Sequence, residues 1–283
     1  MTVVVVGAGL AGVACARTLQ EAGQPVVLLD RGRRIGGRMA SRRLDDRAVD
    51  LGASYLTVSD PAFETVVEDW QQRGLARPWT DTFAVAGGEP KTGPLRWAAP
   101  GGLRSLVEDL ASGLEVVDAT TVQSVRRAAE GWLVDDRRAS AVVLAMPDPQ
   151  AHRLLDEDVR TELPPAASFE PVLALVAGWA QRCWDFDGLF VNDHQSLAWV
   201  ADDGRRRGDG APVLVAHSTP SFAADHLVDP AAAGPELSRA LQAVLQAPEP
   251  ISTHVHRWTF ARPAMSETSM RMSLPTSFGS MCW

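Results

Sequence analysis

Residues 3–12 read Val3-Val4-Val5-Val6-Gly7-Ala8-Gly9-Leu10-Ala11-Gly12, a run of β-branched valines followed by glycines in the spacing G-x-G-x-x-G. The valines predict a short strand that ends at the first glycine. Residues 10–22 have helical character, and a second apolar run, 25–29, ends at Asp30. Strand, tight turn, helix and strand in this order predict a βαβ unit, and the right-handed crossover between its parallel strands begins a doubly wound sheet.

The glycine pattern between this strand and helix is typical of a dinucleotide site. The first glycine permits the turn, the second lets backbone approach a pyrophosphate, the third lets the helix pack on the strand, and the helix N-terminus attracts the anion. Asp30 follows the last glycine by 18 positions, where its carboxylate can accept hydrogen bonds from a ribose. The same carboxylate would repel a 2′-phosphate. An ordinary glycine-rich turn is the alternative interpretation.

A second glycine pair, Gly36-Gly37, follows this acid and is itself followed by Arg38 and Met39. The pair predicts a second close approach of backbone to the cofactor, and Arg38 supplies a fixed positive fork for a phosphate. The segment Asp50-Leu51-Gly52-Ala53-Ser54-Tyr55 comes a short way further along the chain. A surface loop of arginines is the alternative for the region around the glycine pair.

The remaining segments predict a mixture of helices and strands. Residues 141–146 form a continuous apolar run, which predicts a strand in the interior of a covered parallel sheet. Asp60 and Pro61 predict the N-terminus of a helix, as its cap and its first residue. Residues 80–99 predict short strands, with turns at Gly87-Gly88 and Gly93-Pro94. No internal repeat or long linker separates independent modules, so we expect two interleaved domains.

The composition describes a folded chain and excludes several classes of partner. The 283 residues carry a formal net charge of −8 at pH 7, which opposes a general affinity for nucleic acid. No window of about 18 uninterrupted apolar residues predicts a membrane span, and the N-terminal segment lacks the basic residues of a signal peptide. Three cysteines far apart in sequence fit a reducing cytoplasm, and His254 and His256 lack a third ligand for a metal.

These motifs resemble the flavoprotein group that includes amine oxidases, phytoene desaturases and renalases, and more closely the bacterial renalase-like proteins. The resemblance extends over roughly residues 1–263 and is carried by Gly36-Gly37-Arg38-Met39, 50–55, Pro100-Gly101-Gly102-Leu103, 142–150, Leu197-Ala198-Trp199-Val200 and 256–263.

The resemblance implies FAD as the cofactor and an α/β fold. A doubly wound Rossmann-type FAD-binding domain is then interleaved with a smaller mixed-sheet substrate domain. The FAD-binding domain is expected over 1–60 and 100–160, with 257–283 as an incomplete C-terminal piece. The substrate domain is expected over 61–99 and 161–256.

The resemblance also implies which residues contact the cofactor. Ser54 and Tyr55 would approach the flavin, and Val122 would meet the adenine through its backbone. The expected cofactor-binding residues are Gly7, Ala8, Gly9, Leu10, Ala11, Gly12, Asp30, Arg31, Gly36, Gly37, Arg38, Met39, Gly52, Ala53, Ser54, Tyr55 and Val122.

The resemblance implies an oxidase activity with oxygen as a partner. Renalases oxidise isomeric dihydronicotinamide dinucleotides by hydride transfer to flavin N5, and oxygen then takes the electrons as peroxide. A flavin amine oxidase, with an amine as the small-molecule substrate, is the alternative. Many amine oxidases of this fold place a lysine in the substrate domain, whereas the single lysine here is Lys91 and residues 171–260 contain none. The position of the lysine therefore favours the renalase-like activity.

The substrate-site candidates are Trp199, His217 and Arg257, on strands that resemble those covering the flavin in the family. Each has a structural alternative: a core tryptophan, a hydrogen-bonded buried histidine and an arginine paired with a surface acid. Arg205-Arg206-Arg207 could attract a phosphate, but its place after Asp202-Asp203-Gly204 predicts a solvated turn. A hydride donor that becomes aromatic needs no general base, so no catalytic residue is assigned.

The sequence after Ala264 departs from the resemblance. Proteins of the group continue into a strand that ends in Gly-Asp and a last helix that contacts the flavin, and residues 265–283 contain no Gly-Asp. Alanine disappears there, while four of the seven methionines fall within this segment. We expect a shifted reading frame or a truncation. A second alternative follows from it, an inactive dinucleotide-binding remnant.

Overall fold

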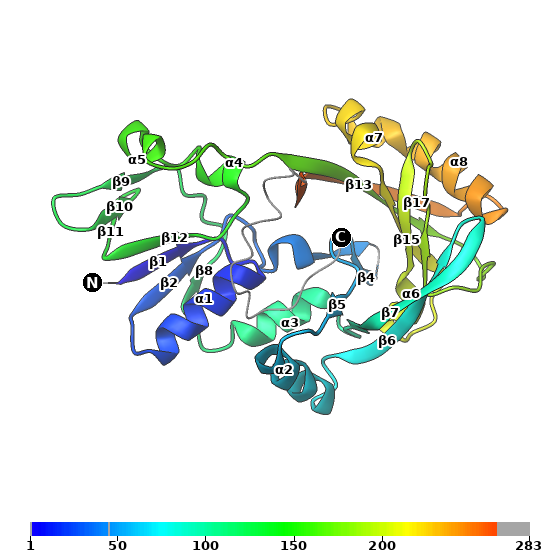
Figure 1. Ribbon diagram of the computed structural model, residues 1–283, viewed down its shortest axis with the longest axis horizontal. Coiled ribbons are helices and arrows are strands. Elements are labelled where there is room, and N and C mark those ends of the chain that lie inside the picture. Colours follow the sequence, from blue (N-terminus) through cyan, green and yellow to red (C-terminus); the bar gives the residue numbers. More distant parts are fainter. Residues whose placement is uncertain (1, 45, 265–283) are drawn as a thin grey trace. The chain divides into compact units, whose positions relative to one another are not determined.

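The computed structural model describes residues 2–44 and 46–264 of the chain (Figure 1). The chain divides into two compact units that are interleaved in sequence. The first unit is Met1–Ala40 with Val107–Ser168, and the second unit is Ser41–Leu106 with Phe169–Trp283. The expected departure of residues 265–283 from the family lies outside the described residues.

The first unit is built around a parallel sheet of four strands in the order β12-β1-β2-β8 (Figure 1). β1 (Val3–Val6) and β2 (Val26–Leu29) are the two predicted strands, and α1 (Leu10–Glu21) is the predicted helix between them. β8 (Val116–Val117) and β12 (Ala141–Leu144) complete the sheet. Because β1 and β2 pair in parallel across the helix, the predicted βαβ unit is confirmed.

A small antiparallel sheet and short helical segments complete the first unit. The sheet has the strands β9 (Val125–Arg127), β10 (Trp132–Val134) and β11 (Arg137–Ala139). The helical segments are η1 (Gly37–Met39), α4 (Asp148–Ala151) and α5 (Glu157–Thr161), and α3 (Leu103–Leu110) begins in the second unit and ends in the first. Apolar side chains of β1, β2, β9 and β10 form the core of this unit.

The position of β12 corrects one prediction. Its apolar run predicts an interior strand, but among the described residues β12 lies at the edge of the sheet, with side chains that are exposed or half-buried. β1 takes a central place because it pairs with both β12 and β2. An apolar run indicates burial but not strand order, which long-range pairing decides.

The second unit is built around a mixed sheet of eight strands. In spatial order these are β17 (Ser252–Pro263), β13 (Phe169–Gly178), β16 (Val213–Ser218), β15 (Leu197–Asp202), β14 (Gly188–Phe190), β6 (Arg77–Val85), β7 (Gly88–Ala98) and β5 (Leu56–Thr57). β14 pairs with β6 in parallel, and the other neighbours are antiparallel. A separate hairpin is formed by β3 (Ser41–Leu44) and β4 (Arg47–Asp50).

Five helical segments belong to this unit: α2 (Pro61–Gln72), α6 (Asp203–Arg207), α7 (Pro220–Asp225), η2 (Pro230–Ala233) and α8 (Gly234–Leu245). The predicted start of α2 is confirmed, because the Asp60 side chain accepts hydrogen bonds from the backbone of Ala62 and Phe63 at 2.9 and 3.1 Å. No helix in the described part of the chain is long and apolar enough to cross a membrane.

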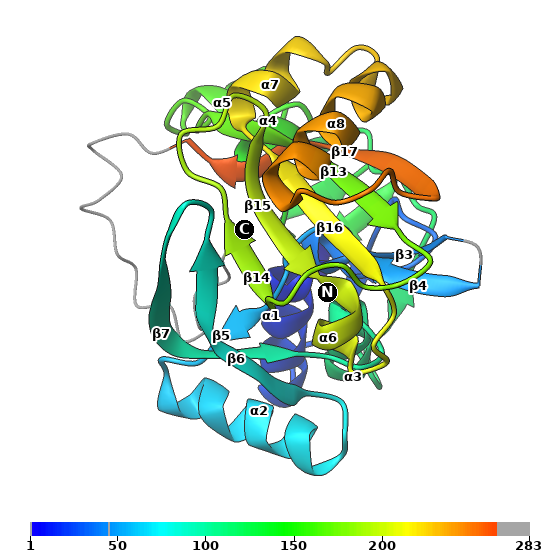
Figure 2. The same cartoon turned by 90° about the vertical axis from the view of Figure 1, so that its right-hand side faces the viewer.

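The eight-stranded sheet has two different faces. Helices α7 and α8 cover what we call the helix face (Figure 2), where Leu237 and Leu241 are fully buried in the core. The other face, which we call the hairpin face, packs against the segment that follows β4. There Leu51 shares a cluster with Ala174 and Trp258. Alternate residues of a strand point to opposite faces, so each strand contributes to both.

The two units differ from the expected domains in four segments. Residues 161–168, expected in the substrate domain, lie in the first unit. Residues 41–60 and 100–106 lie in the second unit. Residues 257–263 continue β17, which pairs with β13 from end to end, so they belong to the mixed sheet and not to the Rossmann-type domain. The second unit also holds more of the chain than the first, whereas the sequence predicts a smaller substrate domain.

The stretch over 80–99 also corrects a prediction. β6 and β7 form one long hairpin, and Gly93-Pro94 lies inside β7 instead of at a turn. A Cβ atom on Gly93 would lie 2.9 Å from Nη2 of Arg96. The glycine therefore leaves room for a neighbouring side chain on the same strand.

We expect Leu241→Ala to lower the free energy of unfolding by about 2–5 kcal/mol, because truncation of a fully buried leucine leaves a cavity. Denaturant unfolding followed by circular dichroism measures the change. Leu95→Ala is the matched control in the same unit, since Leu95 is 42% exposed, and its cost should stay below about 1 kcal/mol. Equal losses for the two variants would contradict the described packing of α8.

Candidate functional site

The glycine turn of the first unit is closely packed. A Cβ atom on Gly12 would lie 1.9 Å from the carbonyl oxygen of Gly7 and 3.0 Å from the Cβ of Ala145. No side chain fits at such distances, so α1 can approach β1 and β12 only because residue 12 is glycine. The third glycine of the motif thus performs the packing role that the pattern predicts.

The two glycine motifs touch each other. Gly36 donates a backbone hydrogen bond to the carbonyl of Ala8 at 2.9 Å, and Gly9 forms a bridge with Gly36. Gly37 has a φ of +52°, and a Cβ there would lie 3.0 Å from the Cα of Gly9. Two segments that are separate in sequence therefore present bare backbone side by side at the N-terminal end of α1.

Asp30 fixes the geometry of both loops. Its Oδ2 accepts a hydrogen bond from the backbone of Ala8 at 2.7 Å, and its Oδ1 accepts one from Gly32 at 2.7 Å. Each carboxylate oxygen can accept a second hydrogen bond, so these contacts leave acceptor capacity for a hydroxyl such as that of a ribose. The backbone of the protein itself thus orients the carboxylate of Asp30 at the end of β2.

The N-terminus of α1 has the properties of an anion site. Its N-cap, Gly9, makes no side-chain capping bond, and its first turn contains no acidic residue. The partial positive charge of the helix end and its unpaired N–H groups therefore remain available. A helix end with two glycine loops and an oriented acid fits the pyrophosphate and ribose of a dinucleotide. The residues of the first unit are therefore suited to the ADP part of FAD.

The other predicted residues of the first unit have mixed surroundings. Met39 is buried, and Val122 lies in the core of the unit, 5% exposed. Arg31 and Arg38 lie at the surface. Their contacts with a cofactor stay predictions.

In the second unit, segment 50–55 is held by side chains from the hairpin face of the sheet. Leu51 accepts hydrogen bonds at its carbonyl from His217 Nε2 at 3.2 Å and Trp258 Nε1 at 2.9 Å. The Oγ of Ser54 accepts one from Trp199 Nε1 at 3.0 Å, and the Ser54 carbonyl accepts one from Arg206 at 3.0 Å. Gly52, Ala53 and Tyr55 are buried beside them. The predicted segment is thus rigidly positioned.

A buried network of charges supports this segment. Asp203 is fully buried and contacts Arg206 at 2.6 Å, Arg207 at 3.2 Å and Arg47 at 2.6 Å. Arg207 also reaches Oδ1 of Asp50 at 3.1 Å. Burial alone would raise the pKa of Asp203, but Arg206 and Arg207 lower it below its usual value. The carboxylate therefore stays charged and binds its arginines.

This network corrects the expectation of a solvated turn at Arg205-Arg206-Arg207. Arg206 is 0% exposed and Arg207 is 7% exposed, both within the short helix α6. A signal was present in the sequence, because Arg206 and Arg207 follow Asp203 by three and four positions, the spacing of neighbours on a helix. Sequence reasoning missed it because a run of charges ordinarily indicates a surface.

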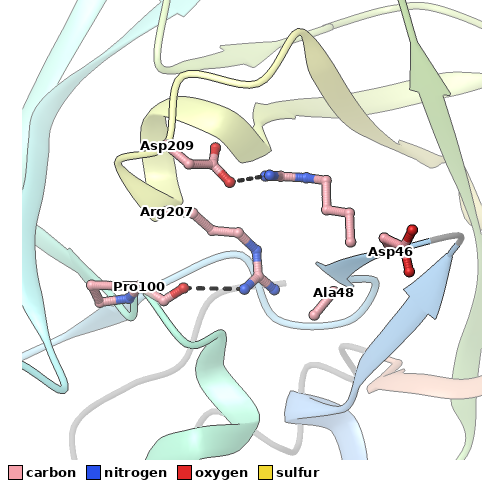
Figure 3. Close-up of a pocket in the computed structure, with 6 residues that line it drawn as sticks. Asp46, Ala48, Pro100, Arg207 and Asp209 are labelled. Carbon is pink, nitrogen blue, oxygen red and sulfur yellow. Dashed lines mark hydrogen bonds and ion pairs between the residues drawn. The ribbon is translucent and has the colours of Figure 1, made fainter.

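A cavity of about 450 Å³ lies beside the network (Figure 3). Arg207 donates to the carbonyl of Pro100 at 3.3 Å, and Arg47 forms an ion pair with Asp209 (Figure 3). The residues that line it are Asp46, Arg47, Ala48, Pro100, Arg207 and Asp209. Arginines and aspartates are equal in number, so the charges cancel. We assign no ligand to this cavity.

Of the substrate-site candidates, the structure brings Trp199 and His217 together. They are paired across β15 and β16, and both side chains reach segment 50–55 on the hairpin face. Arg257 is exposed and donates instead to the carbonyl of Leu227, in the loop after α7. Because Arg257 alternates with His256 and Trp258 along β17, its side chain points to the helix face.

An aromatic cluster in the second unit was not predicted from the sequence. Rings of Phe83 and Trp199 lie 4.6 Å apart, and Tyr55 lies 5.3 Å from Phe83. We call Tyr55, Trp79, Phe83, Phe190 and Trp199 the aromatic cluster. The spacing of Trp79 and Phe83, four apart on one strand, places them on one face and was the available signal.

Two family models match the chain. A model described as NAD(P)-binding Rossmann-like domain matches residues 5–70. A model described as flavin containing amine oxidoreductase matches residues 79–272, which is more than half of the chain.

The proteins similar to this chain include oxidases. Putrescine oxidase from Kocuria rosea is 37% identical over 67 residues, which cover 24% of this chain and 14% of that protein. Lysine-specific histone demethylase 1 homolog 3 from Oryza sativa subsp. indica is 48% identical over 60 residues, covering 20% of this chain and 7% of that protein. The matched parts are thus short segments of these relatives.

A solved structure shows the shared fold over a longer range. Cyclohexylamine oxidase from Brevibacterium oxydans superimposes with a TM-score of 0.70 at 15% sequence identity, covering 91% of this chain and 84% of that chain.

We expect Gly12→Ala to weaken FAD binding by at least about tenfold, because the added methyl group cannot fit between α1 and Gly7. The flavin absorbance that stays with the protein after dialysis measures the loss. Gly23→Ala is the control: a Cβ there meets nothing within 4 Å, so it should cost about 1 kcal/mol of stability and retain the flavin. Full flavin content in Gly12→Ala would contradict the proposed pyrophosphate site.

We expect the protein to lose stability as the pH falls from about 6.5 to about 4. Burial, with the nearby Arg206 and Arg262, lowers the pKa of His217 to about 4. In this range the unfolded chain therefore takes up a proton that the folded chain does not, at a cost of roughly 3 kcal/mol. Above about 6.5 both states are neutral and the effect vanishes.

Unfolding free energies of wild type and His217→Gln, measured across this pH range, test the assignment. The variant should show a shallower decline, while His256, whose pKa burial also lowers to about 4, keeps part of it. An unchanged decline in His217→Gln would show that His217 does not cause it.

Proposed function

The chain belongs to the flavin containing amine oxidoreductase family, and from this premise we propose that it oxidises a dihydronicotinamide dinucleotide rather than an amine. The family implies FAD as the cofactor of an oxidoreductase. Bound FAD supplies a two-electron acceptor, with oxygen as the final acceptor. The touching glycine loops, the uncapped end of α1 and Asp30 would hold its pyrophosphate and ribose.

One observation carries the choice of substrate: the buried carboxylates of the second unit are already paired with arginine. Asp50 contacts Arg207, Asp203 contacts Arg206, and Asp202 forms an ion pair with Arg182. Among residues 2–44 and 46–264, the buried acids are these three aspartates. An amine substrate is an ammonium ion near neutral pH, and a buried ammonium requires a partner of opposite charge. None of these buried acids is left to provide it.

The aromatic cluster supports the same conclusion. Aromatic rings can bind a substrate cation through their faces. Here a protein cation already occupies that position, because the guanidinium of Arg96 lies 4.2 Å from the ring centre of Phe83. A second cation would be repelled, whereas a neutral planar ring can stack on Tyr55 and Trp199.

The remaining polar groups suit the removal of a hydride. His217 is neutral at pH 7, since its pKa is lowered to about 4, and its Nε2 donates to Leu51. It is therefore neither a base nor a cation in the working range. A dihydronicotinamide ring becomes aromatic when it loses a hydride and releases no proton from nitrogen, so it needs no base.

An amine oxidase activity is the second candidate. It is favoured by the similarity of a 67-residue part of this chain to putrescine oxidase, at 37% identity. Lys91 does not support it, because this lysine is exposed on β7. The inactive remnant is a further outcome, and its sequence basis, residues 265–283, lies outside the described residues.

We expect the purified protein to be yellow and its flavin to be bleached rapidly by isomeric dihydronicotinamide dinucleotides in the absence of oxygen. Stopped-flow absorbance measures the rate, with putrescine and cyclohexylamine as the competing substrates. Bleaching by an amine but not by a dihydronicotinamide would assign the second candidate. A colourless protein that also ignores added FAD would be the inactive remnant.

A further inference from the structure

In the described part of the second unit three arginines are buried, and they differ in their partners. Arg206 and Arg207 each contact the carboxylate of Asp203. Arg96, on β7, is 7% exposed and has no carboxylate within ion-pair distance in the described part of the chain. A buried charge without a partner of opposite charge costs several kcal/mol. Arg96 is therefore the exception among the three.

The contacts of Arg96 hold it in place without neutralising it. Its guanidinium lies 4.2 Å from the ring centre of Phe83 and 6.0 Å from that of Tyr55, and it donates to the carbonyl of Asp81. Its Nε is buried and has no acceptor. Gly93 lies so close to Nη2 that any side chain there would displace the guanidinium. The fold thus makes room for a positive charge at this point of the aromatic cluster.

A second N–H group of the aromatic cluster, the Nε1 of Trp79, is also buried without a hydrogen-bond acceptor in the described part of the chain. The Trp79 ring lies 5.4 Å from Phe83 and 6.1 Å from Tyr55, the two rings that Arg96 also contacts. Buried N–H groups are normally paired. Two orphaned donors and an unpaired positive charge around two rings indicate an acceptor that carries negative charge.

We propose that Arg96, with Trp79, binds an anionic group of the substrate, so that the substrate is a planar ring molecule carrying a phosphate or a carboxylate. This inference rests on the proposed function and names the substrate class of the same oxidation. An arginine recognises both anions through the same charged, forked hydrogen bonds. The phosphates of a dinucleotide and a carboxylate on the ring are the two sources.

A purely structural role for Arg96 would not explain why this arginine is buried. Cation–π contact with Phe83 and one bond to a carbonyl would be satisfied by an arginine at the surface, where water completes its hydrogen bonds. Burial of Arg96 without a carboxylate has a cost that these contacts offset only in part. An anionic ligand supplies the missing charge and the missing acceptor together.

The test uses the FAD-loaded protein and three probes: a dihydronicotinamide dinucleotide, N-benzyl dihydronicotinamide, which is neutral, and N-benzyl dihydronicotinate, which carries a carboxylate. Arg96→Gln should raise KM for the anionic probes by about tenfold or more and leave the neutral probe within about twofold. Arg43→Gln is the matched control, because Arg43 is 72% exposed, and all its constants should stay at the wild-type values.

The pattern across the probes identifies the source of the anion. A raised KM for the dinucleotide alone indicates its phosphates, and a raised KM for the ring carboxylate alone indicates that group. An equal change for the neutral and anionic probes overturns the proposal, because it would show a general structural role. No change for any probe also overturns it.

A binding measurement separates this proposal from the proposed function. Titration calorimetry of oxidised NAD into the FAD-loaded protein requires no turnover. Weaker binding in Arg96→Gln supports the anion site even where no dihydronicotinamide bleaches the flavin, an outcome that would overturn only the oxidation. Unchanged NAD binding in Arg96→Gln, or none to wild type, rules out the phosphates as the bound anion, and together with an unchanged KM for the carboxylate probe it overturns the anion site.

Arg96→Lys keeps the test valid where Arg96→Gln does not fold. Lysine retains the charge but not the forked geometry, so its KM for the anionic probes should lie between those of wild type and Arg96→Gln. In wild type, KM for these probes should rise with ionic strength, while KM for the neutral probe should not. A neutral probe with the same salt dependence would contradict the proposal.

Discussion

The second unit depends on the buried ion pair between Asp203 and Arg206. Both side chains are fully buried, and the pair allows Arg206 to donate to the backbone carbonyls of Asp50 and Ser54. Without the carboxylate, the guanidinium would be an unpaired charge in the core, at a cost of several kcal/mol. The ion pair offsets the cost of burying Arg206, and the buried guanidinium then makes two backbone hydrogen bonds that fix segment 50–55. Segment 50–55 in turn offers the acceptors for Trp199, His217 and Trp258, so strands far apart in sequence converge on one short piece of chain.

The same unit shows two ways of placing an arginine in a protein interior. Around Asp203 the charges are balanced within the chain, and the result is rigidity. At Arg96 no carboxylate of the described chain neutralises the positive charge, and the surroundings are aromatic instead of acidic. The first arrangement stabilises a loop whatever is bound, whereas the second has its full energetic benefit only with an anion present. The difference between the paired arginines and the unpaired Arg96 therefore links the fold of the second unit to the charge of its substrate.

The elements that depend on local sequence signals could be predicted from the sequence. The strand, glycine turn, helix and strand at 3–29, and the cap of α2 at Asp60, were predicted because their signals lie within a few residues of one another. The edge position of β12, the continuation of β17 through 257–263 and the burial of Arg206 were not predicted. Each of these depends on which distant strand or loop comes to pack there. The candidate site was partly predicted, because Trp199 and His217 meet on one face. The aromatic cluster had only a local signal in the spacing of Trp79 and Phe83, and the place of Arg96 beside it depends on the pairing of β6 and β7.

The bare Cα of Gly93 links two positions of β7. A Cβ atom at 93 would lie 2.9 Å from Nη2 of Arg96, so a side chain there would force the guanidinium to shift from its present position. A substitution at position 93 is therefore expected to move the guanidinium of Arg96 within the aromatic cluster. In this chain, the missing side chain at 93 and the charge at 96 together shape the cluster for the negatively charged substrate group that we propose. The charge selectivity that we propose for this chain thus also depends on a residue, Gly93, that has no side chain.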